Sequence, residues 1–505
     1  MGTGLVASVR LLIVALSLFS VAVTQPLQGQ YISSASRLSY VPQHTDLMPG
    51  SRPKLKGWLG MTGLSGVAFR LDNSLLHPEG LFSPGPNGGT ILRLDPLISQ
   101  LSGPDNRIAV ANALELASFG FSGGENGESI WSFRARERFE AEVNLPGDLL
   151  AFPFTGNPGG STLDLSPFAL RGIHFREYSV GWNRAWGDFL NTGVRLNYLY
   201  GMEYAELMDF EASWATNPTD FSYSLSATGA FRSSGLNALS QVDDSLQHYL
   251  LFRDNRGLSV DLGARLAISE KATVGLHVVD WGSISWVEDL STLSLEPTTF
   301  AYAGPSIAGE DALSFFEGDS LSNWIDAEAN RLDSAFQPIS NDAAFETVLP
   351  MRIIGEGAYE IRDTESALTS LHAALVGRYA ARNLADWQLS VGAVHEWKRK
   401  MGASVNYTQF STGYGSLGAG ISLNLGMFQW YLAADNLLLM PWTELVVNDN
   451  TIPLPNRADV INLQTGFNLV FGRKPLRHKD KPADVEKTAK RKGIPCEDFM
   501  AGGSR

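Results

Sequence analysis

Apolar and polar residues alternate with a period of two along much of the chain. From Trp131 to Val143 nearly every second residue is apolar, and the residues between them are mostly Ser, Arg and Glu; only Glu137 breaks the order. Such alternation predicts β-strands with one apolar and one polar face. It returns at residues 194–202, 221–232, 258–268, 367–379, 387–397, 403–407, 428–434 and 461–471.

These segments suit a barrel that crosses a membrane. Most run for about 8 to 14 residues, the length that a tilted strand needs to cross a hydrocarbon layer, whereas strands of water-soluble proteins usually end near five or six. We therefore predict an all-β fold, a transmembrane antiparallel β-barrel of about 14 strands, with 12 or 16 as alternatives. The apolar face of residues 221–231, which includes Leu225, is expected to meet lipid.

The connections between the predicted strands differ in length. Tight turns lie near residues 270, 384, 400 and 426, and long loops span 232–257, 290–345 and 438–459. Short turns on one rim and long loops on the other are typical of outer-membrane barrels. We expect residues 53–472 to form the barrel, with 290–345 as a long extracellular loop containing short helices. Phe316 and Trp324 in that loop are candidates for a lid or docking element. The alternative, which the sequence favours equally, is a loop that only packs on its own barrel.

The N-terminal residues predict export. Arg10 precedes an apolar run from Leu11 to Val23, which is too short for a spanning helix and is typical of a signal peptide over residues 1–24. The alternative is an N-terminal membrane anchor. Residues 25–52 are polar and poor in strands, so we expect a hatch that enters the barrel lumen or a periplasmic segment. Residues 145–154 are a second candidate for the lumen.

Charge separates the C-terminal tail from the rest of the chain. The net charge is -14, but residues 473–505 hold ten Lys or Arg against five Asp or Glu. The acidic body argues against nucleic acid as a partner. The basic tail is expected to be flexible and periplasmic, and a periplasmic protein is a candidate partner for it. The single cysteine, Cys496, excludes an internal disulfide.

The last alternating segment ends abruptly at Phe471. Gln464, Gly466, Leu469 and Phe471 have the spacing of the assembly signal in the last strand of outer-membrane barrels. This resemblance implies recognition by the barrel-assembly machinery.

Several phrases also resemble a known family. They are "WLGMTGLSGVAFRLDNS" from Trp58, "LGARLAISEKATVGLHVVDWGSISW" from Leu262, and "WYLAADNLL" from Trp430 followed by "INLQTGFNLVFG". Together they resemble a family of Bacteroidetes-type outer-membrane barrels of uncharacterised function, distantly similar to FadL-like fatty-acid transporters and PorV-type secretion barrels. The resemblance implies no catalytic residue.

The sequence holds no catalytic or metal-binding motif that we recognise, so neither an enzyme nor a cofactor is expected. Charged residues on the polar strand faces are candidates for the lumen instead. They either line a solute path or pair across neighbouring strands in a plugged lumen, and we favour pairing. These candidates are Arg134, Arg136, Arg138, Glu140, Glu142, Arg195, Asp261 and Arg265.

Two functions fit these predictions. The first is an outer-membrane barrel, surrounded by outer-membrane lipid, that takes up or binds a hydrophobic or small solute as FadL-like proteins do. The second is a structural or secretion-associated barrel that docks partners without transport. An apolar lumen pocket with an opening in the wall favours the first function, and a sealed lumen favours the second.

Overall fold

The computed structural model describes residues 34–75, 77–78, 80–84, 90–103, 106–124, 127–237, 254–302, 320–364, 367–380, 383–411, 415–435, 442–447, 450–455 and 460–473. The expected signal peptide, the tail beyond residue 473 and Phe316 lie outside these ranges.

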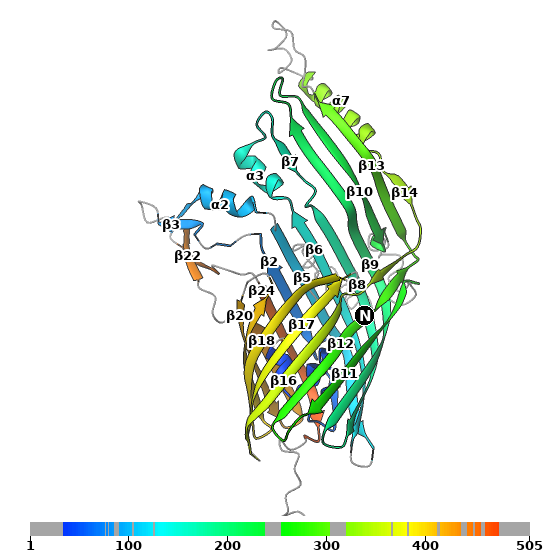
Figure 1. Cartoon of the computed structure of the whole chain (residues 1–505), viewed down its shortest axis with the longest axis vertical. Coiled ribbons are helices and arrows are strands. Elements are labelled where there is room, and N and C mark those ends of the chain that lie inside the picture. Colours follow the sequence, from blue (N-terminus) through cyan, green and yellow to red (C-terminus); the bar gives the residue numbers. More distant parts are fainter. Residues whose placement is uncertain are drawn as a thin grey trace, which may run out of the picture.

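Fourteen antiparallel barrel strands, which we call staves, close into a barrel (Figure 1). β1 and β2 lie one after the other at a single position of the ring and together count as one stave. The prediction of an antiparallel barrel of about 14 strands is confirmed. In order around the barrel the staves are β1 (Gly57–Gly60) with β2 (Val67–Asn73), β5 (Asn106–Gly123), β6 (Ser129–Leu145), β8 (Ala169–Trp186), β9 (Leu190–Thr216), β11 (Arg256–Ala267), β12 (Ala272–Trp286), β16 (Met351–Asp363), β17 (Ala367–Ala380), β18 (Asn383–Trp397), β19 (Met401–Phe410), β20 (Gly415–Leu425), β21 (Phe428–Asp435) and β24 (Val460–Phe471).

The last stave closes the barrel by pairing with the first. β24 pairs with β21 on one side and with β1 and β2 on the other, and Phe471 lies opposite Gly57. Every ladder edge of the ring is thus used, which a barrel requires because an open edge would expose unpaired backbone groups.

Alternation along the staves divides the outer wall from the lumen. On β9, Leu196 is 53 % exposed on the outside, while its neighbour Arg195 is 6 % exposed on the inside. Large apolar side chains recur on the outer wall of most staves. They include Phe121, Val180, Leu258, Leu276, Ile361, Leu375, Val391, Tyr407, Ile421 and Phe467. The outer wall is therefore an apolar belt, as a lipid-facing surface requires.

One part of the sheet rises beyond the barrel, and we call it the wing. The 27-residue strand β9 pairs with β11 through residues 190–200 and with β10 (Tyr223–Ser234) through residues 204–216. β10 also pairs with β13 (Leu290–Tyr302), β13 with β14 (Ile339–Asn341), and β9 with β7 (Thr162–Asp164). In Figure 1 these strands project above the ring.

The wing corrects two predictions. Its strand β10 carries the face around Leu225 that we expected to meet lipid, but β10 is not a stave of the barrel. The segment 290–345 is not only loop and helix, because it begins with β13 and later contains β14. Both errors have one cause. Alternation shows that a strand has one apolar and one polar face. It does not show whether that strand lies within the membrane or beyond it.

Two helices flank the apolar face of the wing. Aromatic rings run across it from Phe152 of α3 (Gly147–Thr155) through Trp214, Tyr223 and Tyr302 to Trp324 of α7 (Ser320–Ala335), with ring centroids 5.1, 5.4, 4.4 and 5.9 Å apart. The expectation that residues 145–154 enter the lumen is wrong. They form α3, whose apolar side chains are used on the wing.

The remaining elements lie at the long-loop end or in the lumen. At that end are the hairpin of β3 (Phe82–Pro84) and β4 (Thr90–Leu92), helix α2 (Leu94–Leu101), β15 (Phe345–Val348), and the hairpin of β22 (Trp442–Val447) and β23 (Asn450–Pro455). The 3-10 helices η1 (Ser34–Arg37) and η2 (Pro42–Asp46) lie inside the barrel. In the described part of the chain, no helix is both long and apolar enough to cross a membrane.

Candidate functional site

Residues 34–56 fill part of the lumen, and we call this segment the plug. Its apolar side chains Leu38, Val41 and Leu55 are fully buried. They pack against apolar wall residues in separate clusters: Leu38 and Val41 near Val394, and Leu55 near Trp58. Because the lumen faces of the staves are otherwise polar, these clusters give the plug a fixed place inside the barrel.

Two wall glycines make room for the plug. A Cβ atom at Gly193 of β9 would lie 1.7 Å from the carbonyl oxygen of Pro49, and one at Gly263 of β11 would lie 2.3 Å from the amide nitrogen of Gly50. A larger residue at either position would displace the plug. The two glycines therefore let the plug backbone lie directly on the wall.

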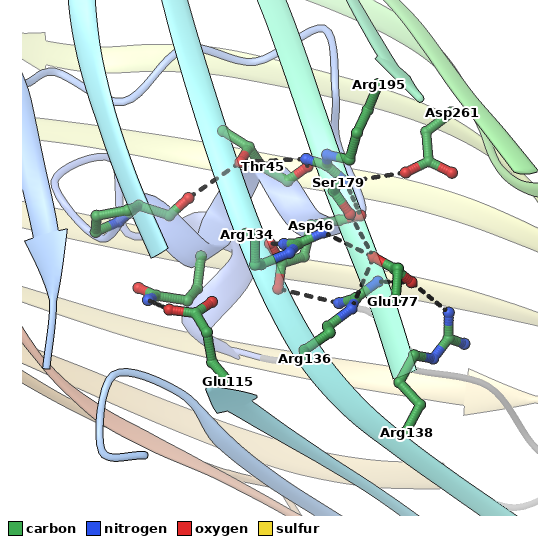
Figure 2. A network of polar contacts seen from close by, with 12 residues as sticks. Thr45, Asp46, Glu115, Arg134, Arg136, Arg138, Glu177, Ser179, Arg195 and Asp261 are labelled. Carbon is green, nitrogen blue, oxygen red and sulfur yellow. Dashed lines mark hydrogen bonds and ion pairs between the residues drawn. The ribbon is translucent and has the colours of Figure 1, made fainter. Parts of the chain in front are cut away.

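The end of η2 is anchored on arginines of β6 and β9 (Figure 2). Asp46 forms an ion pair with Arg134 and lies 3.5 Å from Arg136. Arg195 Nη2 donates to the Thr45 carbonyl oxygen at 2.8 Å, and Arg195 Nη1 pairs with Asp261 at 3.0 Å. Asp46 and Thr45 of the plug thus supply acceptors that these wall arginines would otherwise lack.

A buried ion network continues behind this anchor. Glu177 of β8 accepts hydrogen bonds from Arg136 at 3.0 Å and Arg138 at 3.2 Å (Figure 2). Asp280 of β12 accepts from Arg138 at 2.8 Å and also pairs with Arg352 of β16. The network joins five arginines to five carboxylates and is balanced in charge, as burial demands. Its members are Arg134, Arg136, Arg138, Arg195, Arg352, Asp46, Glu140, Glu177, Asp261 and Asp280.

A second anchor holds the other side of the plug. Arg37 of η1 pairs with Glu356 of β16 at 2.8 Å, and His277 of β12 contacts the same carboxylate at 3.1 Å. The Gly50 amide donates to Nδ1 of His277 at 3.3 Å. His277 must therefore carry its proton on Nε2, which leaves Nδ1 to accept.

The regular pairing of the first stave is interrupted between β1 and β2, and the plug braces this irregular segment from inside. The paired positions Leu59–Phe119 and Val67–Leu114 enclose residues 60–66 on the first stave but only 115–118 on β5. Gln43 of the plug donates Nε2 hydrogen bonds to the Ser65 carbonyl oxygen and to Glu115, both at 3.0 Å. The Glu115 amide also donates to the Gly66 carbonyl oxygen at 2.7 Å, so Gln43 adds a side-chain link to a backbone link between these two segments.

The last stave also contacts the Gln43 amide. Asn468 Nδ2 of β24 donates to Gln43 Oε1 at 3.1 Å, and Asn468 Oδ1 lies 3.1 Å from Gln43 Nε2. Gly466 permits close contact, because a Cβ atom there would lie 2.0 Å from the Ser65 carbonyl oxygen.

A narrow pocket remains between the plug and the wall. Its empty space, including the part open to solvent, is about 580 Å³. Ser36, Gln43, Asp46 and Leu47 line it from the plug, and residues of β2, β5, β6 and β24 line it from the wall. Among the described residues, no group of three or more His, Cys, Asp or Glu side chains is arranged to hold a metal ion.

A family profile matches residues 49–435, that is, most of the barrel. Its description is "Family of unknown function (DUF5723)". The chain belongs to this family. The predicted membership of an uncharacterised family is thereby confirmed, and the Bacteroidetes origin that the resemblance implied stays a prediction.

Several solved structures are similar to this DUF5723 member. A FadL homologue of Pseudomonas aeruginosa has a TM-score of 0.41 at 11 % identity, covering 89 % of this chain and 99 % of that chain. The Pseudomonas putida toluene transporter TodX has 0.39 at 9 %, covering 88 % and 98 %. The Ralstonia pickettii toluene transporter TbuX has 0.34 at 10 %, covering 81 % and 90 %. A search of curated proteins gives no match. The barrel architecture itself rests on the strand pairing of this chain.

The candidate lumen residues of the DUF5723 barrel lie together in the structure. Six of the eight belong to the network above or contact it; the others are Arg265, which lies 3.7 Å from Glu356, and Glu142, which is half-buried on the same face of β6 as Glu140. Trp324 lies on the wing, against Tyr302. In β24, Gln464 lines the pocket, Gly466 contacts Ser65, Leu469 is half-buried, and Phe471 is 46 % exposed on the outer wall.

The partners of these residues were not predicted from the sequence. Glu177 follows the alternation of β8 and was within reach of the same argument. Asp280 could not be found by alternation. It adopts a φ of 62° where the pairing of β12 with β11 shifts register, so the consecutive residues Val279 and Asp280 are both buried. The plug residues Asp46 and Gln43 carry no strand period, so only the fold reveals their role. Glu137, which broke the alternation of β6, lies on the outer face and pairs with His174 at 2.9 Å and Arg176 at 2.7 Å.

Proposed function

We propose that the chain is an outer-membrane barrel that takes up a small solute, with residues 34–56 as a displaceable plug. The observation that carries this proposal is that one segment both fills part of the lumen and, through Gln43, braces the irregular part of the wall between β1 and β2. Displacement of this one element would thus open the lumen. The proposed role is transport and not catalysis.

The proposed location follows from the two ends of the barrel and from the apolar belt. The belt on the outer wall suits outer-membrane lipid. The turns between β8 and β9 and between β11 and β12 are short, so we place that end in the periplasm and the wing outside the cell. This proposal includes export by a signal peptide over residues 1–24, assembly through the signal in β24 and a periplasmic partner at the basic tail.

The plug is held by two kinds of contact, namely the apolar clusters around Leu38, Val41 and Leu55 and a set of polar anchors. Its anchors are ion pairs and hydrogen bonds around Asp46, Arg37 and Gln43. Buried ion pairs repay only part of the cost of removing charges from water, so they hold an element less firmly than an apolar interface of equal size. Water that enters the lumen would take over these contacts when the plug moves.

The test locks the plug to the wall. The Ser34 Cβ atom lies 3.1 Å from the position of a Cβ atom at Gly420 of β20, close to the separation of about 3.8 Å in a disulfide. We expect a Ser34→Cys/Gly420→Cys protein, with Cys496→Ser, to reduce D-glucose flux into proteoliposomes to the protein-free level when oxidised, and to recover when reduced. Each single cysteine variant is the matched control. Equal flux through the oxidised and reduced protein would contradict a moving plug.

The alternative of docking without transport is favoured by a different observation. The anchor network is balanced in charge and lies in the lumen beside the plug, and the wing offers a surface beyond the barrel. In that case neither the wild-type protein nor the reduced double-cysteine variant would pass solute.

A further inference from the structure

Basic side chains gather at the short-turn end of the barrel, the end away from the wing (Figure 1). Residues 398–400 form the turn between β18 and β19, and all three are exposed. The end of β24 lies beside this turn, because Arg399 Nη1 donates to the Arg473 carbonyl oxygen at 3.3 Å. A Cβ atom at Gly472 would lie 2.7 Å from the Lys56 side chain, which brings a further cation to the same place. We call the five cations Lys56, Lys398, Arg399, Lys400 and Arg473 the basic rim.

The charge of the basic rim is not neutralised within the described part of the chain. None of its five side chains forms an ion pair with a carboxylate there. Glu396, which lies next to the turn in sequence, is 1 % exposed and accepts hydrogen bonds from the Ser39 amide at 2.8 Å and the Ser39 hydroxyl at 2.7 Å. The rim is therefore a positive surface on a chain whose net charge is -14.

The backbone of the turn is one that Lys and Arg rarely adopt. Lys398 has a φ of 49° and Arg399 a φ of 56°. They occupy the two central positions of a turn that the Lys400 amide closes on the Trp397 carbonyl oxygen at 2.9 Å. Asn and Gly are favoured at such positions, because a larger side chain crowds the backbone when φ is positive. Two cations held where they cost stability indicate that their side chains are used.

The turn lies at the border of the apolar belt. Trp397, 44 % exposed, is the last residue of β18 on the outer wall, and Leu389 and Val391 are exposed further along the same face. Lys398 Nζ lies 4.8 Å from the centroid of the Trp397 ring. Tryptophans at the ends of the apolar faces of barrel strands lie at the level of the lipid headgroups. The cations of the turn are therefore within reach of headgroup phosphates.

We propose that the basic rim binds the phosphate groups of anionic phospholipids in the adjoining leaflet, mainly through Lys398, Arg399 and Lys400. An anionic membrane surface attracts basic residues strongly at this short range. The inference goes beyond the proposed function, because it assigns a lipid site and not a solute path. Its test involves no flux, so failure of the lipid site would leave the moving plug standing, and failure of the plug test would leave the lipid site standing.

The test compares two exposed lysines on different turns of the same end. Full-length protein in detergent is titrated with short-chain phosphatidylglycerol or phosphatidylcholine, and native mass spectrometry counts the bound lipids. The wild type should prefer phosphatidylglycerol, and the preference should disappear in roughly 0.5 M salt, which screens exposed charges. We expect Lys398→Gln to weaken the binding of phosphatidylglycerol roughly fivefold, the effect of one cation near an anionic surface. Lys271→Gln, in the turn between β11 and β12, should bind as wild type does.

A second variant separates lipid binding from the local structure of the turn. Lys398→Asn/Arg399→Gly supplies residues that suit the positive φ angles, so its heat-modifiable band should persist to a higher temperature than that of the wild type. The same variant should lose the preference for phosphatidylglycerol. A more stable variant that kept the full preference would show that the two cations only connect strands, and would overturn the site.

The remaining outcomes decide the occupant. Equal binding of the two lipids by the wild type, or equal loss in Lys398→Gln and Lys271→Gln, would overturn the site. Inorganic phosphate or a deca-glutamate peptide that displaced phosphatidylglycerol at equal concentration would overturn the lipid as its occupant. The first result would assign the rim to a free anion, and the second to an acidic protein segment.

Discussion

At the scale of single residues, His44 links the seating of the plug to pH. Burial lowers the pKa of His44 to about 4, and the cations Arg265 and Lys54 add to this effect, whereas the hydrogen bond to the Val41 backbone and the charge of Glu356 oppose it. The neutral imidazole donates Nδ1–H to the Val41 carbonyl oxygen at 2.8 Å. Because a displaced plug would return His44 to its ordinary pKa of 6.5, the displaced state binds the proton more readily than the seated one.

The seated plug should therefore lose stability as the pH falls from about 6.5 towards 4, by roughly 2 kcal/mol between pH 7 and pH 5. Hydrogen exchange of the plug amides measures this loss. In His44→Gln, which cannot be protonated in this range, plug protection should be the same at both values. A plug equally protected at pH 7 and pH 5 in the wild type would disprove the linkage.

At the scale of elements, β9 contains both a membrane stave and a strand of the wing. Leu196 lies in its lower half, 53 % exposed on the outer wall, and Leu225 lies opposite Trp214 of its upper half. Leu196→Arg should impair insertion at a cost of roughly 2 to 4 kcal/mol near the bilayer midplane. Leu225→Arg should loosen the wing and leave insertion intact.

The amount of heat-modifiable protein in the outer membrane compares these two variants. Ser224→Arg, on the polar face of β10, is the control for arginine on the wing. If Leu225→Arg blocked insertion as strongly as Leu196→Arg, β10 would be part of the membrane wall.

At the scale of the whole molecule, β24 closes the barrel and Phe471 ends it on the outer rim. A charge at the rim costs only about 1 kcal/mol or less, so lipid burial alone predicts a small effect of Phe471→Asp. If β24 carries the assembly signal, Phe471→Asp should instead strongly reduce assembled protein, while Phe471→Leu and removal of residues 474–505 should not. Normal assembly of Phe471→Asp would contradict a role of β24 as the assembly signal.

The sequence by itself determined the local order of the barrel. Alternation of two residues identified eight of the fourteen staves, among them β6 with its lumen arginines and the closing strand, because each strand has one apolar and one polar face whatever its neighbours are.

Only the tertiary structure decided where those strands stand and what their polar faces contact. The wing and the staves have the same alternation, so β10 was placed in the membrane until its pairing with β13 was known. The irregular plug has no period at all. Asp46 and Gln43 gain their partners across 88 and 425 residues of sequence, and such contacts exist only once the barrel has closed around them.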